Sequence, residues 1–214
     1  MNESQTGTER KAHWDSVYTK NAPDAVSWYR PHLETSLRLI ESAVADEGRT
    51  EAAILDAGGG QSSLAADLLD RGFGHVTVCD VSEVALAKAR EQLGNAAARA
   101  EWRVGDVLAV PLPVSYFDVW HDRAVFHFLR DPADKETYVR RMTDGLKSGG
   151  HAVMATFGPE GPMKCSGLEV CRYDATALAE TMGAGFRLVE SLTEMHATPM
   201  GTEQQFLYCH FVRV

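Results

Sequence analysis

Three consecutive glycines, Gly58 to Gly60, follow an apolar segment that begins at Ala53 and contains Asp56. A strand, a glycine-rich turn and a helix in this order bring backbone N–H groups close to a ligand in α/β proteins. Glycine suits such a turn because a side chain would block the ligand and because the turn can require a positive φ. Three glycines also fit an ordinary loop, so this interpretation depends on the rest of the sequence.

Three aspartates, Asp56, Asp80 and Asp106, each end a predicted strand. Any one of them fits a helix cap or a turn. However, the carboxyl ends of parallel strands meet at one edge of a sheet, where small molecules bind. A carboxylate about 20 residues after the glycines can accept hydrogen bonds from both ribose hydroxyls, and one on the next strand can accept from an adenine amino group. Together the three residues predict a nucleoside site.

The glycine turn lacks the features of two common phosphate-binding motifs. The dinucleotide pattern G-x-G-x-x-G would need a glycine where Ser63 stands. In addition, no lysine of the Walker type follows the glycines. The sequence therefore predicts a nucleoside ligand without phosphates.

Apolar periodicity predicts the elements that position these residues. Strands are expected at the segment starting at Ala53 and at His75–Cys79, Trp102–Val104, Phe117–His121, His151–Phe157, Arg187–Met195 and Gln205–Val212. Helices are expected from Leu33 to near Gly48, from Leu64 to Arg71, from Ser82 to Leu93, from Asp131-Pro132 to a stop at Gly149-Gly150, and from Asp174 to Met182. This alternation predicts an α/β fold with a doubly wound, mostly parallel sheet. We expect residues 1–30 to form an N-terminal lead and aromatic lid, loosely held over residues 1–11, and residues 31–214 to form a single ligand-binding domain.

Length, composition and charge exclude several classes of protein. The 214 residues suit one domain, and the net charge of −9 disfavours a nucleic-acid partner. No apolar run approaches the roughly 20 residues needed to span a bilayer, and the first residues lack the apolar core of a signal peptide. Four cysteines without C-x-x-C spacing suggest neither disulfides nor a metal site, so no metal is expected. We expect a cytoplasmic protein with no membrane partner.

The combination Asp56-x-Gly58-x-Gly60, Asp80 and Gly105-Asp106-Val107 resembles the class I S-adenosylmethionine (SAM)-dependent methyltransferases. The resemblance covers about residues 30–214 and includes the segment Leu146–Gly150. It implies a Rossmann-like sheet of seven strands with the last strand antiparallel, and SAM as the cofactor.

The resemblance also implies a role for each matched position. The glycine turn, Gly58 to Gly60, approaches the methionine part of SAM, and Asp56 orients the turn or reaches the cofactor's amino group. Asp80, with Val81, holds the ribose hydroxyls. Asp106, with the Val107 backbone, holds adenine. Ser62 stands where the family has a third glycine, which leaves the detail of the turn open.

Residues after the fourth predicted strand are candidates for the acceptor side and for catalysis. The run from His121 to His127 is similar to that of thiopurine and small thiol methyltransferases. Arg123 could steer an anionic acceptor or brace the lid, or it could form a structural ion pair with Asp122. His121 or His127 could take a proton near neutral pH, or each could be a satisfied core histidine.

The aromatic lead supplies the remaining candidates. It resembles the lead of bacterial relatives of small protein-lysine methyltransferases, in which an N-terminal segment closes over SAM. Trp28 and Tyr29 would contact the methionine end, while Trp14 and Tyr18 shape the lid and a ring contributes a cation–π contact to the sulfonium. Alternatively, the aromatic residues are ordinary packing. Cys165, Cys171 and His196 are weaker acceptor-side candidates, and Cys165 is either an inert thiol or a ligand for a soft element.

We therefore expect an enzyme, a SAM-dependent methyltransferase acting on a small-molecule nucleophile: a thiol, another soft heteroatom or an amine. A small-molecule acceptor is favoured over a protein. Two alternatives stay open, a protein-lysine methyltransferase and a non-catalytic SAM-binding regulatory protein. The sequence does not indicate the oligomeric state.

Overall fold

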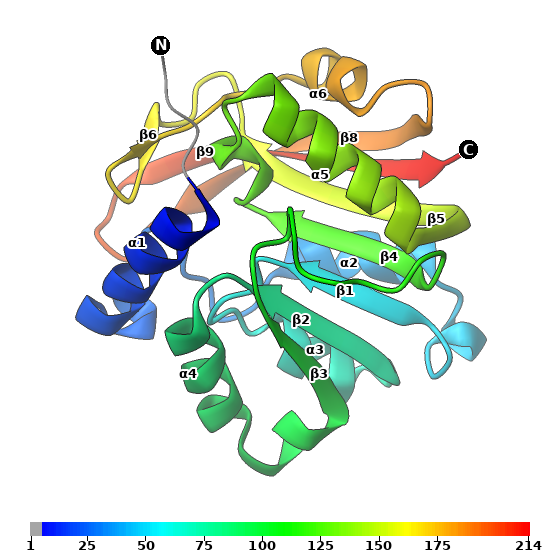
Figure 1. Cartoon of the computed structure of the whole chain (residues 1–214), viewed down its shortest axis with the longest axis horizontal. Helices are drawn as coiled ribbons and strands as arrows, with labels where there is room; N and C mark the ends of the chain where they lie inside the picture. The colour runs from blue at the N-terminus through cyan, green and yellow to red at the C-terminus, as the bar shows by residue number, and fades with distance from the viewer. Residues whose placement is uncertain (1–5) are drawn as a thin grey trace.

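A computed structural model describes residues 6–214 of the chain. Within this range, seven strands form one sheet in the order β3-β2-β1-β4-β5-β9-β8, which twists from β3 at the bottom of Figure 1 to β8 at the top. The strands are β1 (Ala53–Ala57), β2 (His75–Asp80), β3 (Ala100–Val104), β4 (Phe117–Arg123), β5 (Leu146–Phe157), β8 (Phe186–Ala197) and β9 (Glu203–Arg213). The order reverses between β1 and β4, which places a topological switch point beside the glycine turn.

Strands β3, β2, β1, β4 and β5 are parallel, and β9 pairs antiparallel with both β5 and β8. The carboxyl ends of β1, β2 and β4 therefore lie at one edge of the sheet, since Asp56 is level with His121 of β4 and Ala57 with Cys79 of β2. The predicted mostly parallel, seven-stranded sheet with an antiparallel last strand is confirmed.

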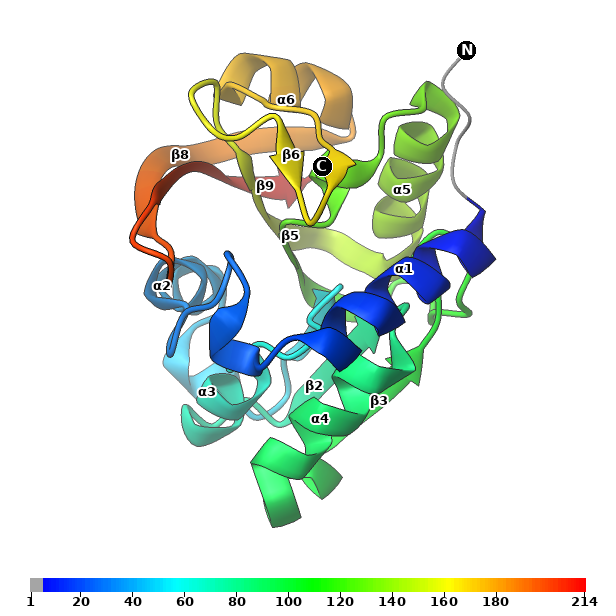
Figure 2. The same cartoon turned by 90° about the vertical axis from the view of Figure 1, so that its left-hand side faces the viewer.

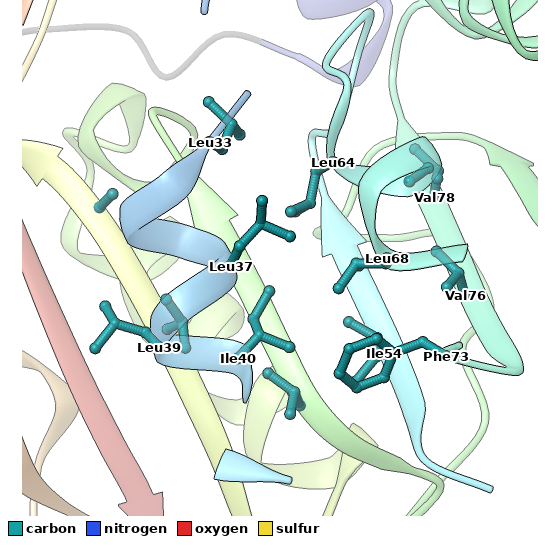
Figure 3. Close-up of a cluster of buried hydrophobic side chains, with 14 of the residues drawn as sticks. Leu33, Leu37, Leu39, Ile40, Ile54, Leu64, Leu68, Phe73, Val76 and Val78 are labelled. Atoms are coloured by element: carbon teal, nitrogen blue, oxygen red, sulfur yellow. The ribbon is translucent and has the colours of Figure 1, made fainter. Parts of the chain in front are cut away.

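Helices cover both faces of the sheet. They are α2 (Glu34–Ala43), α3 (Leu64–Asp70), α4 (Glu83–Leu93), α5 (Pro132–Gly145) and α6 (Ala175–Met182), with short 3₁₀ turns at Pro23–Ala25, Asp46–Gly48, Gly94–Arg99 and Phe126–Phe128. The apolar stripes of α2, α3 and α4 pack on one face, and those of α5 and α6 pack on the other. Figure 3 shows Leu37 and Ile40 of α2 facing Leu64 and Leu68 of α3 in the first of these cores.

Two regions differ from the sequence expectations. Helix α5 ends at Gly145, so the prediction of a helix stop at Gly149-Gly150 is wrong: these glycines lie inside β5, where the register with β4 shifts between Phe117 and Val119. The loop after β5 contains an unpredicted hairpin of β6 (Lys164–Cys165) and β7 (Leu168–Glu169).

Helix α1 (Gly7–Lys20) includes residues 7–11, which were expected to belong to a loosely held lead. The Thr6 hydroxyl accepts from the Glu9 N–H and the Glu9 carboxylate accepts from the Thr6 N–H, which is a capping box. Residues 1–5 of the expected lead lie outside the described residues. Figure 2 shows α1 beside α4, where Asp15 accepts hydrogen bonds from the Ser82 hydroxyl (2.7 Å) and the Val84 N–H (3.4 Å).

Among the described residues, no helix combines the length and apolar character that crossing a membrane requires. All four cysteines are free thiols.

Candidate functional site

A cavity of about 130 Å³ lies at the carboxyl ends of β1, β2 and β4, beside the switch point. The sequence-predicted site residues that line it are Trp14, Trp28, Tyr29, Asp56, Gly58, Gly59, Asp80, Val81, Asp106, Val107, His121 and Arg123. Gly60 and His127 are not among its lining residues. One cavity thus brings together the predicted cofactor residues and one end of the predicted acceptor region.

The glycine turn is crowded by the protein itself. Gly58 has a φ of +72°, and a Cβ there would overlap a methyl group of Val125. Gly60 has a φ of +52°, and a Cβ there would meet the hydroxyl of Tyr18. The N–H groups of Gly58 and Gly59 both donate to the Cys79 carbonyl (2.7 and 3.2 Å). The turn therefore passes close to the ligand space without offering these two N–H groups to a phosphate.

Asp80 is a buried carboxylate at the end of β2. Its Oδ1 accepts from the Ser82 N–H (2.7 Å), and the Gly60 N–H also bonds to the carboxylate. Burial raises the pKa of Asp80 to about 7, although these hydrogen bonds lower it. The nearby Asp56 and Asp15 also raise this pKa. Asp80 is thus a strong acceptor held against the cavity wall, where hydroxyl donors from a ligand would stabilise its charge.

Asp106 sits two strands out from the turn and is already engaged by α1. Its Oδ1 accepts from the Leu108 N–H (2.9 Å), while its Oδ2 accepts from Arg10 Nε (2.8 Å) and Nη2 (2.7 Å). Arg10, which also lines the cavity, was missed by the sequence reasoning because the helix that carries it was expected to be loose. The Thr6-x-x-Glu9 capping box was the signal that could have found this helix.

Asp56 belongs to a buried chain of hydrogen bonds. The His121 Nδ1–H donates to Asp56 Oδ1 (2.8 Å), and His121 Nε2 pairs with the Ser36 hydroxyl of α2 (2.9 Å). The Ser62 hydroxyl donates to Asp56 Oδ2 (3.4 Å). Both ring nitrogens of His121 are therefore occupied, and the ring fixes the orientation of Asp56.

Asp122 and Arg123 are neighbours in β4 but lie on opposite faces of the sheet. Asp122 accepts from the N–H groups of Val125 (3.0 Å) and Phe126 (3.1 Å) and from the hydroxyl of Tyr138, and burial raises its pKa to about 6. Arg123 instead contacts residues of β9 and of the segment before α2. The alternative of an Asp122–Arg123 ion pair is not what the structure contains.

His127 is fully buried next to the cavity. Its Nδ1 accepts from the Phe157 N–H (3.3 Å), so the hydrogen of the uncharged ring is on Nε2. Burial, and then the charge of Arg123, lower the pKa of His127 to about 3. The ring packs against Phe128 and Phe157, and its role in catalysis stays a prediction.

Aromatic rings from α1 and the segment after it form one wall. Trp14 packs edge-to-face on Trp28 (centroids 5.8 Å apart) and on Phe128 (5.1 Å), and Tyr18 packs on Trp28 (6.3 Å). Cys165 of β6 also lines the cavity, and burial raises the pKa of its thiol to about 11. This part of the cavity is mostly apolar.

His196 of the β8–β9 hairpin supports the same wall from behind. Its Nδ1 accepts from Arg30 Nε (2.8 Å), so its Nε2–H donates to the Ser27 carbonyl (2.7 Å). Glu194 accepts from Arg30 Nη2 (3.5 Å) and from the Thr35 hydroxyl (2.5 Å). The hairpin thereby fixes the segment that carries Trp28 and Tyr29.

Comparison with known proteins agrees with this geometry. Residues 54–150 match the sequence model of a family described as "Methyltransferase domain". An eEF1A lysine and N-terminal methyltransferase homolog from Drosophila melanogaster is 28% identical, over 66% of this chain and 21% of that protein. The ubiquinone/menaquinone biosynthesis C-methyltransferase UbiE of Paracoccus denitrificans is 40% identical, over 30% of this chain and 27% of that protein. The matched region thus spans 27% or less of the length of these two relatives.

A solved structure shares the fold of the whole chain. The 1,6-didemethyltoxoflavin-N1-methyltransferase of Burkholderia thailandensis, solved with 1,6-didemethyltoxoflavin and S-adenosylhomocysteine, gives a TM-score of 0.67 at 20% identity. The match covers 100% of this chain and 93% of that one. The sheet and its helices therefore form a Rossmann-like methyltransferase fold.

Proposed function

Because the chain carries a class I methyltransferase domain, whose methyl donor is SAM, we propose that the protein methylates a small molecule. The observation that carries this proposal is a single cavity lined by two unlike sets of residues. The glycine turn and the carboxylates Asp56, Asp80 and Asp106 form the set that we call the donor end, and Trp28, Phe128 and Arg123 form the set that we call the acceptor end. Such a cavity suits a nucleoside donor at one end and a small acceptor at the other.

The residues at the first end fit SAM. Asp80 is a buried carboxylate that can accept from ribose hydroxyls, and such donors would offset the burial that raises its pKa. Gly58 and Gly59 have their N–H groups bonded to Cys79, which suits a ligand without phosphates. Asp106 would hold adenine, and Asp56, fixed by His121, would face the methionine part. When bound, SAM supplies a methyl group on a positively charged sulfur.

The protein's own residues position the reactants and exclude water. Asp15 ties α1 to the start of α4, and Arg10 ties it to Asp106, so that Trp14 and Tyr18 are held over the cavity. An aligned nucleophile in a dry site needs little further activation. Val81, Val107 and Tyr29 line the same space and would contribute contact surface.

A small acceptor is favoured over a protein by the way the cavity is covered. Trp14 packs on both Trp28 and Phe128 in the wall of the cavity, whereas a lysine side chain on a protein would need an open trough. Because a lysine methyltransferase homolog is among the relatives, the experiments below also test the protein-lysine alternative.

Calorimetry with S-adenosylhomocysteine (SAH), the demethylated cofactor, tests the donor site. We expect SAH to bind the wild-type protein and Asp80→Ala to weaken binding at least about 30-fold, because two hydrogen bonds to a charged group are lost. Asp70→Ala, an exposed change at the end of α3, is the matched control. Failure of SAH to bind the wild-type protein would overturn the proposed function.

Isotope transfer distinguishes the acceptor classes. Tritiated SAM is incubated with the protein and with either the small-molecule or the protein fraction of a bacterial lysate. Label in the small-molecule fraction supports the proposal, and label on lysine residues supports the alternative. SAH binding without any transfer would favour a non-catalytic regulatory protein.

A further inference from the structure

The guanidinium of Arg123 is fixed by contacts that use only part of its hydrogen-bonding capacity. Its Nε donates to the Tyr208 hydroxyl (3.0 Å) and its Nη1 donates to the Trp28 carbonyl (2.9 Å). The guanidinium carbon lies 4.5 Å from the centroid of the Phe206 ring. A guanidinium has five N–H donors, and within residues 6–214 the buried Nη2 of Arg123 has no hydrogen-bond partner.

The surrounding protein does not neutralise this charge. Across the described part of the chain, no aspartate or glutamate forms an ion pair with Arg123. Besides the Tyr208 hydroxyl, the titratable groups near Arg123 include Cys165, His127 and His196: burial raises the pKa of Cys165 to about 11, lowers that of His127 to about 3 and lowers that of His196. Near neutral pH all three are therefore uncharged.

The other two arginines that line the cavity differ from Arg123. Arg10 pairs with Asp106 (2.7 Å), and Arg30 pairs with Glu194 (3.5 Å). A half-buried cation without a counter-ion is unfavourable, and an incoming anion removes much of that cost. Among the described residues, the charge of Arg123 therefore lacks the counter-ion that the charges of Arg10 and Arg30 have.

The walls near Arg123 are apolar. Trp28, Phe128, Leu33 and Ala124 line the cavity and pack on the hydrophobic core that contains Tyr208. A ligand that packs against these walls and pairs with the guanidinium is compact and largely apolar, and it carries one concentrated negative charge.

We propose that the methyl acceptor is a small, largely apolar molecule that binds as an anion on Arg123, with the charge on the heteroatom to be methylated. An acidic thiol bound as its thiolate fits best, and a neutral amine does not fit. This inference rests on the proposed function, because it names the acceptor class for the same cavity.

Among the described residues, neither His121 nor Cys165 is a free base, and this points the same way. His121 has both ring nitrogens paired, and the Cys165 thiol holds its proton. A thiolate needs no base: its lone pair forms the new S–C bond, and the bond from the methyl carbon to the sulfonium sulfur breaks with its electron pair staying on that sulfur. Two uncharged thioethers result, and no proton is left to place.

Thiophenol and its S-methyl ether, thioanisole, form a matched pair of probes. Thiophenol is an aromatic thiol that is ionised at about pH 8, whereas thioanisole is neutral and is also the product of methylation. With SAH-loaded wild-type protein, calorimetry is expected to show thiophenolate binding at least about tenfold more tightly than thioanisole. Arg123→Met should reduce the affinity for thiophenolate at least about tenfold and leave that for thioanisole within about twofold.

Two further variants secure the interpretation. Arg123→Lys keeps the positive charge and should retain part of the preference for the anion. Arg38→Met removes a surface arginine that pairs with Glu190 and should change neither probe. SAH titration of each sample separates the two claims: if wild-type protein binds SAH but prefers thioanisole, shows no preference or binds neither probe, the anion proposal is overturned while the donor site stands. An Arg123→Met protein that binds SAH and keeps the preference would also overturn it.

Discussion

The donor end and the acceptor end of the cavity are built in different ways. At the donor end, two of the three carboxylates are each held by a backbone N–H two residues on, Ser82 for Asp80 and Leu108 for Asp106. At the acceptor end, Arg123 is held by Tyr208, which is 85 residues away in the sequence. The donor end thus combines these local contacts with two long-range ones, His121 to Asp56 and Arg10 to Asp106, whereas the side-chain contact that holds Arg123 at the acceptor end is long-range.

The two ends also carry opposite charges. With Arg10 paired to Asp106, the carboxylates Asp56 and Asp80 leave a net negative charge at the end proposed for the sulfonium cofactor, and Arg123 places positive charge at the end proposed for the acceptor. A cation and an anion that react with each other would be drawn to different ends of the same cavity and would meet between them. This separation favours the correct orientation of both reactants.

The largest expected effect tests whether the donor turn is as rigid as its packing implies. Gly58→Ala should lower the free energy of unfolding by about 3 kcal/mol, because the new methyl group overlaps Val125 and the positive φ is strained. Urea unfolding followed by circular dichroism measures the loss.

A double mutant separates the two causes of that loss. Gly58→Ala combined with Val125→Ala should recover the part due to overlap and leave about 1 kcal/mol from the strained φ. If Gly58→Ala alone were neutral, the turn would be flexible, and the contrast between a rigid donor end and an assembled acceptor end would fail.

A smaller effect concerns the free energy of unfolding that is lost when Asp80 is ionised in the folded protein. Burial raises the pKa of Asp80 from 3.8 to about 7, so the folded protein binds this proton more tightly than the unfolded chain does. The contribution of Asp80 to stability is therefore full below about pH 4 and is lost as the pH rises through about 7. Without SAH, Asp80→Asn should be more stable than wild type by ~2 kcal/mol at about pH 8, with a smaller difference at about pH 5.

The measurement is urea unfolding at the two pH values. Asp122 has a pKa raised to about 6 and gives a slope of the same sign, but it is present in both proteins and cancels in the difference. The variant should also bind SAH at least about tenfold more weakly. A wild-type protein that is the more stable of the two at pH 8 would contradict the assignment of Asp80 as a destabilising buried carboxylate.

The sequence was most informative where function depends on strand ends. Gly58, Asp80 and Asp106 could be proposed because a turn after a strand and an acidic strand end are local patterns, and all three line the cavity. Their convergence followed from the parallel sheet, which alternating apolar segments predict. The stop expected at Gly149-Gly150 failed because glycines that usually end a helix instead lie at an irregularity within β5.

The acceptor end could be predicted only in part, because its contacts join residues that are far apart in the sequence. The sequence proposed Arg123 but left open whether it steers an anionic acceptor, braces the lid or pairs with Asp122, because its partners Tyr208 and Trp28 are 85 and 95 residues away in the sequence. Arg10 was missed because α1 has few apolar residues on its buried face, so periodicity gave no signal there. Cytoplasmic location and the proposed separation of residues 1–30 from the rest stay predictions.

The smallest expected effect probes how the acceptor end is assembled. Tyr208→Phe removes the hydroxyl that accepts from Arg123 Nε and keeps the buried ring. We expect the affinity for thiophenolate to fall about threefold, or ~0.7 kcal/mol, while the affinities for thioanisole and SAH stay unchanged. Tyr116→Phe, at an exposed tyrosine, is the matched control. Because only the anionic probe should respond, the ratio of the two affinities distinguishes a residue that orients the guanidinium from one that only fills the core. If the affinities for both probes fell equally, Tyr208 would contribute only packing. Arg123 would then recognise the anion without a positioning partner on β9.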